Sequence, residues 1–400
     1  MVQRLPRKVL LDTDLHTAAL TVIAEQGIDE MGIPQVAAAA GVTSAPVYRR
    51  FDSADDIVAE LWSTVLRQQF ARSARAALTW NTAPTEREWL TNEILHPSIE
   101  SQALIEVLCA SRRLGPAGAT IRSDFEHDLN EIITSSARVP PVLVLTTISP
   151  VLGSLMLAPL APALPVSVVN TYSRFIDEYA RTEHWALESR NMPYAAPTPI
   201  RWATGENALD DLRLAAVHVV GQFGVANTTV NRITRRAGRS VNTAYRRLGS
   251  KNDLVAEAVS MALNSEFGFS GQENATSMPF GRADRVARSL QVLRNHIDER
   301  NLAHRSFLLE ALLAARHQRD VEAAVTDWFA RVTDRFEVGI TALGLADTES
   351  LKAIWRYRIV AGIGSLVLSL TSSQFTNRYD LMPAVSANDA VLASLLPARF

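Results

Sequence analysis

Residues 15–60 read LHTAALTVIAEQGIDEMGIPQVAAAAGVTSAPVYRRFDSADDIVAE, and residues 212–257 read LRLAAVHVVGQFGVANTTVNRITRRAGRSVNTAYRRLGSKNDLVAE. The two stretches align without a gap at an offset of 197 residues, and about a third of the aligned positions are identical. A repeat at one fixed offset indicates an internal duplication. The identical pairs include residues that suit turns and helix ends: Gly27 and Gly224, Gly41 and Gly238, Ser53 and Ser250, Asp56 and Asp253.

The duplication extends beyond these two stretches. Gly153-Ser-Leu-Met-Leu is echoed by Gly364-Ser-Leu-Val-Leu at an offset of 211 residues. The region between the halves holds three prolines among small and polar residues, which is typical of a linker. We therefore expect two similar units, divided at residues 1–61, 62–187, 188–205 (the linker), 206–258 and 259–400.

Each copy of the repeat begins with two predicted helices. Apolar residues recur at helical spacing over residues 15–26, and Gly27 suits the left-handed conformation that often ends a helix. A second short helix is expected over residues 33–39. Gly41 then supplies the tight turn that a helix-turn-helix requires.

The third predicted helix of the first copy begins after Thr43, a good N-cap residue, and reaches about Tyr48. Pro46 is compatible with it, because the first turn of a helix needs no donor at that position. Ser53 with Asp56 three residues later forms a capping box that opens the next helix. The second copy repeats each element, so the sequence predicts an all-α fold with two helix-turn-helix domains.

The same motifs resemble the DNA-binding domain of the tetracycline-repressor (TetR) family. The resemblance rests on Ala40-Gly41-Val42-Thr43 through Tyr48-Arg49-Arg50-Phe51, and on Ala237-Gly238-Arg239-Ser240 through Tyr245-Arg246-Arg247 to Lys251. It covers about 47 residues in each half. It implies that each remaining part is a helical ligand-binding and dimerisation bundle, and that the partners are a double-stranded DNA operator and an unknown small-molecule effector.

The two copies differ strongly in charge. Residues 15–60 contain two arginines against seven acidic residues, a net charge of −5. Residues 212–257 contain eight basic residues against two acidic ones, a net charge of +6. Because phosphate neutralisation dominates DNA affinity, the second copy is much better equipped to bind DNA. Lys251 stands where the family places a phosphate-contacting lysine, whereas the first copy has Ala54 there.

Base reading is expected from the third helix of each copy. Asn242 suits an adenine edge and Thr243 a thymine methyl group, while Tyr245 and Arg246 suit phosphates. The candidate DNA-contacting residues are Thr43, Ser44, Ala45, Tyr48 and Arg49 in the first copy, and Thr229, Arg236, Ser240, Val241, Asn242, Thr243, Tyr245, Arg246 and Lys251 in the second.

Composition excludes several other classes. Of the 400 residues, 47% are apolar and 20% charged, so the chain can bury large cores and is not disordered. Cys109 is the single cysteine, which excludes an internal disulfide and a multi-cysteine metal centre. Phosphate-binding glycine loops and hydrolase or zinc-protease motifs are missing. We expect no enzyme, cofactor or metal, and the sequence leaves the ligand-binding residues unknown.

One uncharged apolar stretch, residues 139–169, is long enough to span a bilayer but contains six prolines. Proline breaks the backbone hydrogen bonding that lipid demands, so we expect a buried helix or helix pair instead. The basic N-terminus is followed by Asp12 and Asp14 before any apolar core, unlike a signal peptide. We therefore expect no membrane association and a cytoplasmic location.

Together these observations predict a ligand-responsive transcriptional repressor in which the two units pair within one chain as a pseudo-dimer. Two chains could also associate as a homodimer. Two alternatives stay open at this point. In one, only the second helix-turn-helix binds DNA and the first is an interaction module. In the other, the chain is an all-α enzyme or small-molecule-binding protein without DNA binding.

Overall fold

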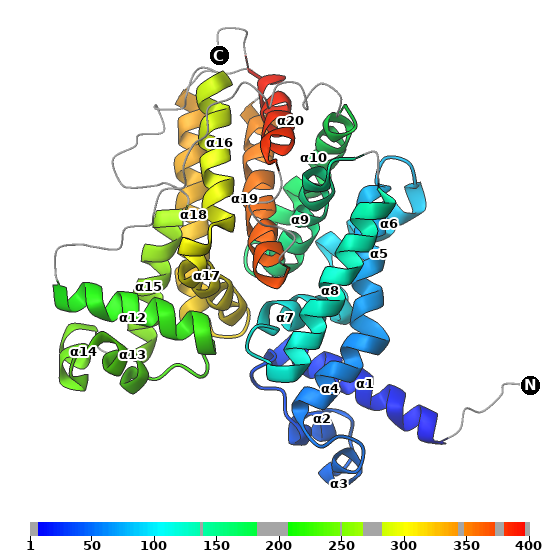
Figure 1. Ribbon diagram of the computed structural model, residues 1–400, viewed down its shortest axis with the longest axis vertical. Coiled ribbons are helices and arrows are strands. Elements are labelled where there is room, and N and C mark those ends of the chain that lie inside the picture. Colours follow the sequence, from blue (N-terminus) through cyan, green and yellow to red (C-terminus); the bar gives the residue numbers. More distant parts are fainter. Residues whose placement is uncertain are drawn as a thin grey trace, which may run out of the picture.

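The structure, a computed structural model, describes residues 7–136, 139–181, 207–248, 250–266, 282–342, 348–372 and 380–396. Within these ranges the regular secondary structure is helical, with no strand (Figure 1). This confirms the prediction of an all-α fold. The predicted linker, residues 188–205, lies outside the described residues.

The helices of each half follow the same order. The first half contains α1 (Arg7–Gln26), α2 (Ile33–Ala39), α3 (Ser44–Tyr48), α4 (Ala54–Leu61), a π-helical turn (Trp62–Leu66), α5 (Arg67–Leu78), α6 (Pro84–Leu95), α7 (Ile99–Ala110), α8 (Gly115–Ser135), α9 (Pro141–Leu157) and α10 (Ala163–Tyr179). The second contains α12 (Asn207–Phe223), α13 (Val230–Ala237), α14 (Val241–Leu248), α15 (Lys251–Glu266), α16 (Arg282–Ile297), a 3₁₀ turn (Glu299–Asn301), α17 (Leu302–Ala315), α18 (Arg319–Ala342), α19 (Thr348–Thr371) and α20 (Met382–Ala393).

The first helix-turn-helix follows the sequence closely. Helix α2 has the predicted bounds, and Gly27 and Gly41 adopt the left-handed conformation, with φ of 91° and 66°. Ser53 and Asp56 form the predicted capping box at the start of α4. Two details differ. Helix α1 begins at Arg7, before the predicted start, and Thr43 occupies the N-cap position of α3 without a side-chain hydrogen bond.

The second helix-turn-helix uses the same devices. Gly224 and Gly238 end their helices with φ of 78° and 62°. The Ser250 hydroxyl accepts from the Asp253 backbone N–H at 3.1 Å, and the Asp253 carboxylate accepts from the Ser250 N–H at 2.9 Å. The glycine turns and the Ser–Asp capping box are therefore common to both copies.

The two helix-turn-helix domains lie at one end of the molecule, with the helical bundles beyond them (Figure 1). Helices α9 and α19 lie side by side where the bundles meet and make the most extensive helix–helix contact of the structure. Every residue of α9 from Val142 to Leu157 is buried. This confirms the prediction that the apolar stretch forms a buried helix pair, α9 with the beginning of α10.

Proline inside α9 is accommodated locally. Pro150 has no N–H to donate to the carbonyl oxygen of Thr146, and the Ser149 hydroxyl donates to that oxygen instead, at 3.2 Å. A buried carbonyl group left without a donor would be costly. The neighbouring serine thus allows α9 to continue through the proline.

Glycine allows α9 and α19 to approach at backbone distance. A Cβ atom added at Gly153 would lie 1.9 Å from the carbonyl oxygen of Val360. A Cβ atom added at Gly364 would lie 1.6 Å from the carbonyl oxygen of Ser149. The two contacts are equivalent under the 211-residue offset, so the interface is self-complementary, as in a two-fold symmetric dimer.

Aromatic side chains extend the contact between the units. Phe175 of α10 stacks on Tyr357 of α19, with ring centroids 3.8 Å apart and an interplanar angle of 6°. The Tyr179 hydroxyl donates to the side-chain oxygen of Asn388 on α20 at 2.7 Å. Aromatic contacts of this kind add to the stabilisation that apolar burial provides.

Among the described residues, α19 alone is long and apolar enough to cross a membrane. Most of its apolar stretch is buried, and its neighbours are α9, α10 and other helices of the bundles. The composition of α19 therefore matches its position as the central helix of a protein core.

The glycine contact generates a stability prediction. We expect Gly364→Ala to lower the free energy of unfolding by about 1–3 kcal/mol or more, because the added methyl group must push α9 and α19 apart. Urea denaturation measures the effect. Ser154→Ala on α9 is the control, because it adds no volume and removes a hydroxyl that bonds its own helix. Equal urea midpoints for Gly364→Ala and the unaltered chain would contradict the prediction.

Candidate nucleic-acid interface

Side-chain caps hold the turn of the second helix-turn-helix. The Thr229 hydroxyl accepts from the Arg232 backbone N–H at 3.2 Å and begins α13. The Ser240 hydroxyl accepts from the Thr243 N–H at 3.2 Å and begins α14. Between them, left-handed Gly238 reverses the chain. This arrangement fixes the direction of α14, the helix expected to read DNA.

One apolar residue anchors each third helix to its domain. Ala244 of α14 is 3% exposed, and its counterpart Val47 of α3 is fully buried. The predicted contact residues of α14 lie on the other side: Asn242, Tyr245 and Arg246 are exposed, and Val241 and Thr243 are half-buried. The structure thus brings them together on one outward surface.

The first domain presents a smaller and less polar surface. Tyr48 is 55% exposed, and Thr43, Ala45 and Arg49 are also exposed, while Ser44 is half-buried. Both third helices carry an exposed aromatic residue at the equivalent position, Tyr48 at 55% and Tyr245 at 52% exposure. Their equivalent positions indicate two surfaces of the same kind.

Three arginines counted in the positive charge of the second copy stabilise the domain itself. Arg213 pairs with Glu257, Arg239 binds Asp211 with an Nε–Oδ2 distance of 3.0 Å, and Arg232 donates to the carbonyl oxygen of Asn227. The Arg213 pair has a counterpart in the first copy, where His16 lies 2.6 Å from Glu60. The net charge of +6 therefore overstates the cations available for phosphates.

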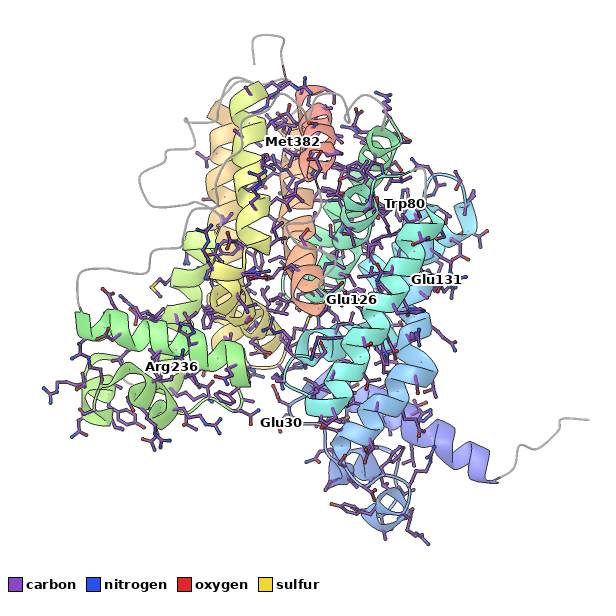
Figure 2. The ribbon with its side chains drawn as sticks, viewed as in Figure 1. Glu30, Trp80, Glu126, Glu131, Arg236 and Met382 are labelled. Atoms are coloured by element: carbon purple, nitrogen blue, oxygen red, sulfur yellow. The ribbon has the colours of Figure 1, made fainter. Side chains whose placement is uncertain are left out.

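The cations that remain available are fewer and lie close to α14. Arg235, Arg236 and Arg246 are exposed and make no ion pair within the described part of the chain. Figure 2 shows Arg236 on this domain. Arg235 was not among the predicted site residues, although the Arg235-Arg236 pair in the sequence could have identified it. Lys251 is half-buried at the start of α15, and this burial lowers its pKa.

The third helix of the first domain is surrounded by acidic residues. Arg50 pairs with Glu60 at 2.7 Å, which leaves Arg49 as the exposed arginine without an ion pair in the described structure. Asp52, Asp55 and Asp56 are exposed next to it, and Glu30 lies on the same domain (Figure 2). The charge around α3 therefore favours phosphate contacts less than the charge around α14 does.

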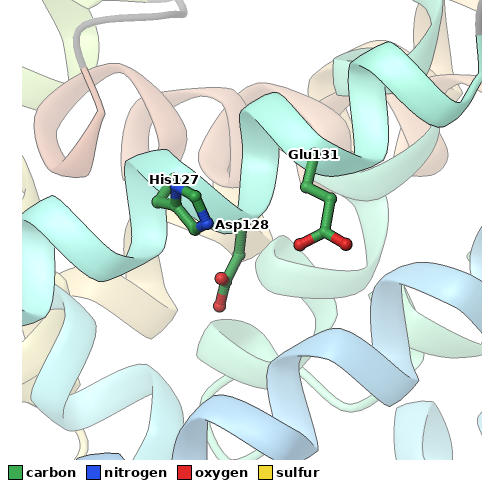
Figure 3. Close-up of side chains that lie close together, drawn as sticks. All are labelled: His127, Asp128 and Glu131. Carbon is green, nitrogen blue, oxygen red and sulfur yellow. The ribbon is translucent and has the colours of Figure 1, made fainter.

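One group of side chains has the composition of a metal site but does not fit one. His127, Asp128 and Glu131 of α8 lie close together (Figure 3). However, both oxygens of Asp128 bind the Arg67 guanidinium, at 2.8 Å from Nε and 2.6 Å from Nη2. A cation at this position would have to displace Arg67. The expectation that the chain holds no metal stays a prediction.

Comparison with known proteins identifies the family. The sequence profile of the bacterial regulatory proteins of the tetR family matches residues 15–61 and again residues 212–258. These matches coincide with the two helix-turn-helix domains described above. Comparison with curated proteins finds no match. The chain therefore carries the DNA-binding domain of the tetR family twice, in tandem, which indicates a DNA-binding transcriptional regulator of that family.

Proposed function

We propose that this regulator is a ligand-responsive repressor that works in the cytoplasm as an intrachain pseudo-dimer on double-stranded DNA. The self-complementary contact at Gly153 and Gly364 carries the proposal, because it joins the units as a two-fold dimer joins two chains. The tethered copy is at high effective concentration, which favours pairing within one chain. Helices α3 and α14 then read two adjacent half-sites.

The two readers differ in chemistry. Exposed Asn242 suits a bidentate contact with adenine, and Thr243 a thymine methyl group. Their counterparts in the first domain, Ala45 and Pro46, offer only apolar contacts. Arg236, Arg246 and Lys251 contact phosphates in this proposal, since base contacts specify sequence and phosphate contacts position the protein.

A groove of about 390 Å³ supports the proposal of ligand response. Its walls come from both units: Leu160 and Leu164 on one side, and Phe329, Glu337 and Arg356 on the other. A small molecule bound there would favour one relative placement of the units over another, which is a population shift. Repression would then be relieved by a change in the spacing of α3 and α14.

The acidic first domain favours a second candidate function. In it, only the second helix-turn-helix binds DNA, and the first is an interaction module. Exposed Asp52, Asp55 and Asp56 beside α3 support this alternative, because they repel phosphates. Substitutions in the two domains distinguish the candidates.

We expect Arg236→Ala, Arg246→Ala and Lys251→Ala together to abolish DNA binding at moderate salt, and Arg49→Ala with Arg50→Ala to weaken it only. Each lost phosphate contact should reduce the slope of log affinity against log salt by about one. The probe is genomic DNA selected by the purified chain, and affinity is measured by gel shift. Arg75→Ala, an exposed arginine of α5, is the control. Equal losses from the two sets would refute the asymmetry of the domains.

We expect a single chain to prefer a non-palindromic operator, with most of its information in the half that α14 reads. The reason is that a bidentate amide contact contributes about 1–3 kcal/mol of base discrimination that alanine cannot match. A footprint and a base-by-base substitution scan of the selected DNA measure this. A short symmetric operator with equal penalties in both halves would count against it.

We expect the DNA-binding species at low concentration to be one chain of 43.8 kDa. Pairing within the chain satisfies the apolar faces of α9 and α19, so a second chain is not needed. Light scattering on dilute protein, with and without operator DNA, gives the mass. DNA binding confined to a species of two chains would contradict the pseudo-dimer.

A further inference from the structure

One arginine in the turn between α7 and α8 bridges the two units. The Nε atom of Arg113 lies 3.2 Å from both carboxylate oxygens of Glu310, on α17 of the second unit. Its two Nη atoms bind the two carboxylate oxygens of Asp29, which follows α1 in the first DNA-binding domain, and the Nη2–Oδ2 distance is 2.9 Å. Arg113 therefore connects the first DNA-binding domain to the second bundle.

The second DNA-binding domain contacts the same arginine. A Cβ atom added at Gly224, the residue that ends α12, would lie 3.1 Å from the Arg113 Nε and 3.2 Å from the Glu310 Oε2. The absence of a side chain at Gly224 thus brings this domain's backbone against the ion pair. The Arg113 side chain lies at the point where both DNA-binding domains and the second bundle meet.

The duplication provides a counterpart to this cluster on the other side. Residues 103–113 (ALIEVLCASRR) align with residues 307–317 (FLLEALLAARH), which pairs Glu106 with Glu310 and Arg113 with His317. Glu106 lies 2.8 Å from the Arg316 Nε and 2.9 Å from the His317 Nε2, so it too is bound by side chains of the other unit.

Among the described residues, the counterpart has no ion pair with a DNA-binding domain of the kind that Arg113 makes. The residue equivalent to Asp29 in the second copy is Ala226, which has no carboxylate. Gly27 packs against the His317 ring, with an added Cβ atom 2.7 Å from its Cδ2, and the neighbouring Ile28 N–H donates to Glu106 Oε2 at 3.4 Å. These contacts link the first DNA-binding domain to the counterpart without an ion pair. The bidentate Arg113–Asp29 pair is therefore present on one side of the pseudo-dimer.

Burial gives the cluster a defined geometry. The side chains of Arg113 and Glu310 are 11% and 7% exposed. Burial raises the pKa of Glu310 to about 7, and the charge of Arg113 opposes this rise. The bidentate pair is Arg113–Asp29, whose carboxylate is 23% exposed, while the contact with Glu310 holds the same guanidinium in a buried position. A bidentate pair of a guanidinium and a carboxylate tolerates little change in orientation, so it specifies geometry more than it stabilises.

We propose that Arg113 is a positioning residue that sets where the first DNA-binding domain lies relative to the second, and thereby the half-site spacing that the chain prefers. The part of the proposal that concerns the placement of the domains does not require DNA binding. The part that concerns half-site spacing rests on the proposed function. Arg113 acts through Asp29 and Glu310 and need not touch DNA itself.

The test measures the distance between the two third helices in the full chain without DNA. Tyr48→Cys and Tyr245→Cys are introduced together, since both positions are exposed, and spin labels are attached for pulsed electron paramagnetic resonance. Cys109, the native cysteine, is 1% exposed and can remain. Asp29→Asn is the principal variant, because it removes the bidentate ion pair, leaves at most one neutral hydrogen bond in its place and leaves no buried charge unpaired.

We expect Asp29→Asn and the double variant Arg113→Gln with Glu310→Gln each to broaden the distance distribution, with unfolding temperatures close to that of the labelled parent. Arg67→Gln is the control, because it breaks the bidentate pair with Asp128 inside one unit and should leave the distribution narrow. Unchanged distributions in both test variants, or equal broadening in the control, would overturn the proposal.

A second measurement compares affinities for selected operators in which the distance between half-sites is varied. The parent chain should bind operators of one spacing most tightly. Asp29→Asn should lower the ratio of this affinity to the affinities for the other spacings by about fivefold or more, which is the lower range of coupling between sites. An unchanged advantage would overturn the part of the proposal that concerns spacing. If the parent binds no DNA, the proposed function fails, while the distance distributions still decide the role of Arg113.

Discussion

The approach of α9 and α19 at Gly153 and Gly364 is the constraint on which the rest of the structure depends. Two helices can pack at backbone distance only where neither carries a side chain, and here each glycine faces the carbonyl oxygen of the residue four positions before the other glycine. The contact fixes the relative placement of two bundles that are otherwise built alike. The position of the DNA-binding domains at one end of the molecule follows from it (Figure 1).

Local signals predicted the helix-turn-helix domains well, because short-range chemistry determines their turns and caps. The left-handed conformation of Gly41 and the capping box of Ser53 and Asp56 depend on the residues themselves and on their near neighbours in the sequence. The predicted start of α1 was wrong, because the first two turns of the helix lack the apolar periodicity on which the prediction rested. Thr43 shows a different failure: its position is correct, but its hydroxyl makes no capping bond.

The sequence indicated which helix would present the candidate DNA-contacting residues, but it did not indicate which of the nearby arginines have partners within the domain. A count of arginines cannot separate Arg239, which Asp211 engages, from Arg236, which is available, because that difference depends on residues far apart in the sequence. The cluster around Arg113 was beyond prediction for the same reason. Its partners come from a different domain and a different unit, and only the folded chain brings Asp29 and Glu310 to one side chain.

The duplication also has a consequence during synthesis. Helix α9 ends at Leu157, and α19, which covers it, begins at Thr348. At roughly 5–20 residues per second, the apolar face of α9 waits about 10–40 s on the ribosome before its partner is made. During that interval the uncovered face of α9 is open to the α19 of a neighbouring chain whose synthesis is further advanced. The delay therefore favours entangled, domain-swapped assemblies unless a chaperone shields α9 until the second half emerges.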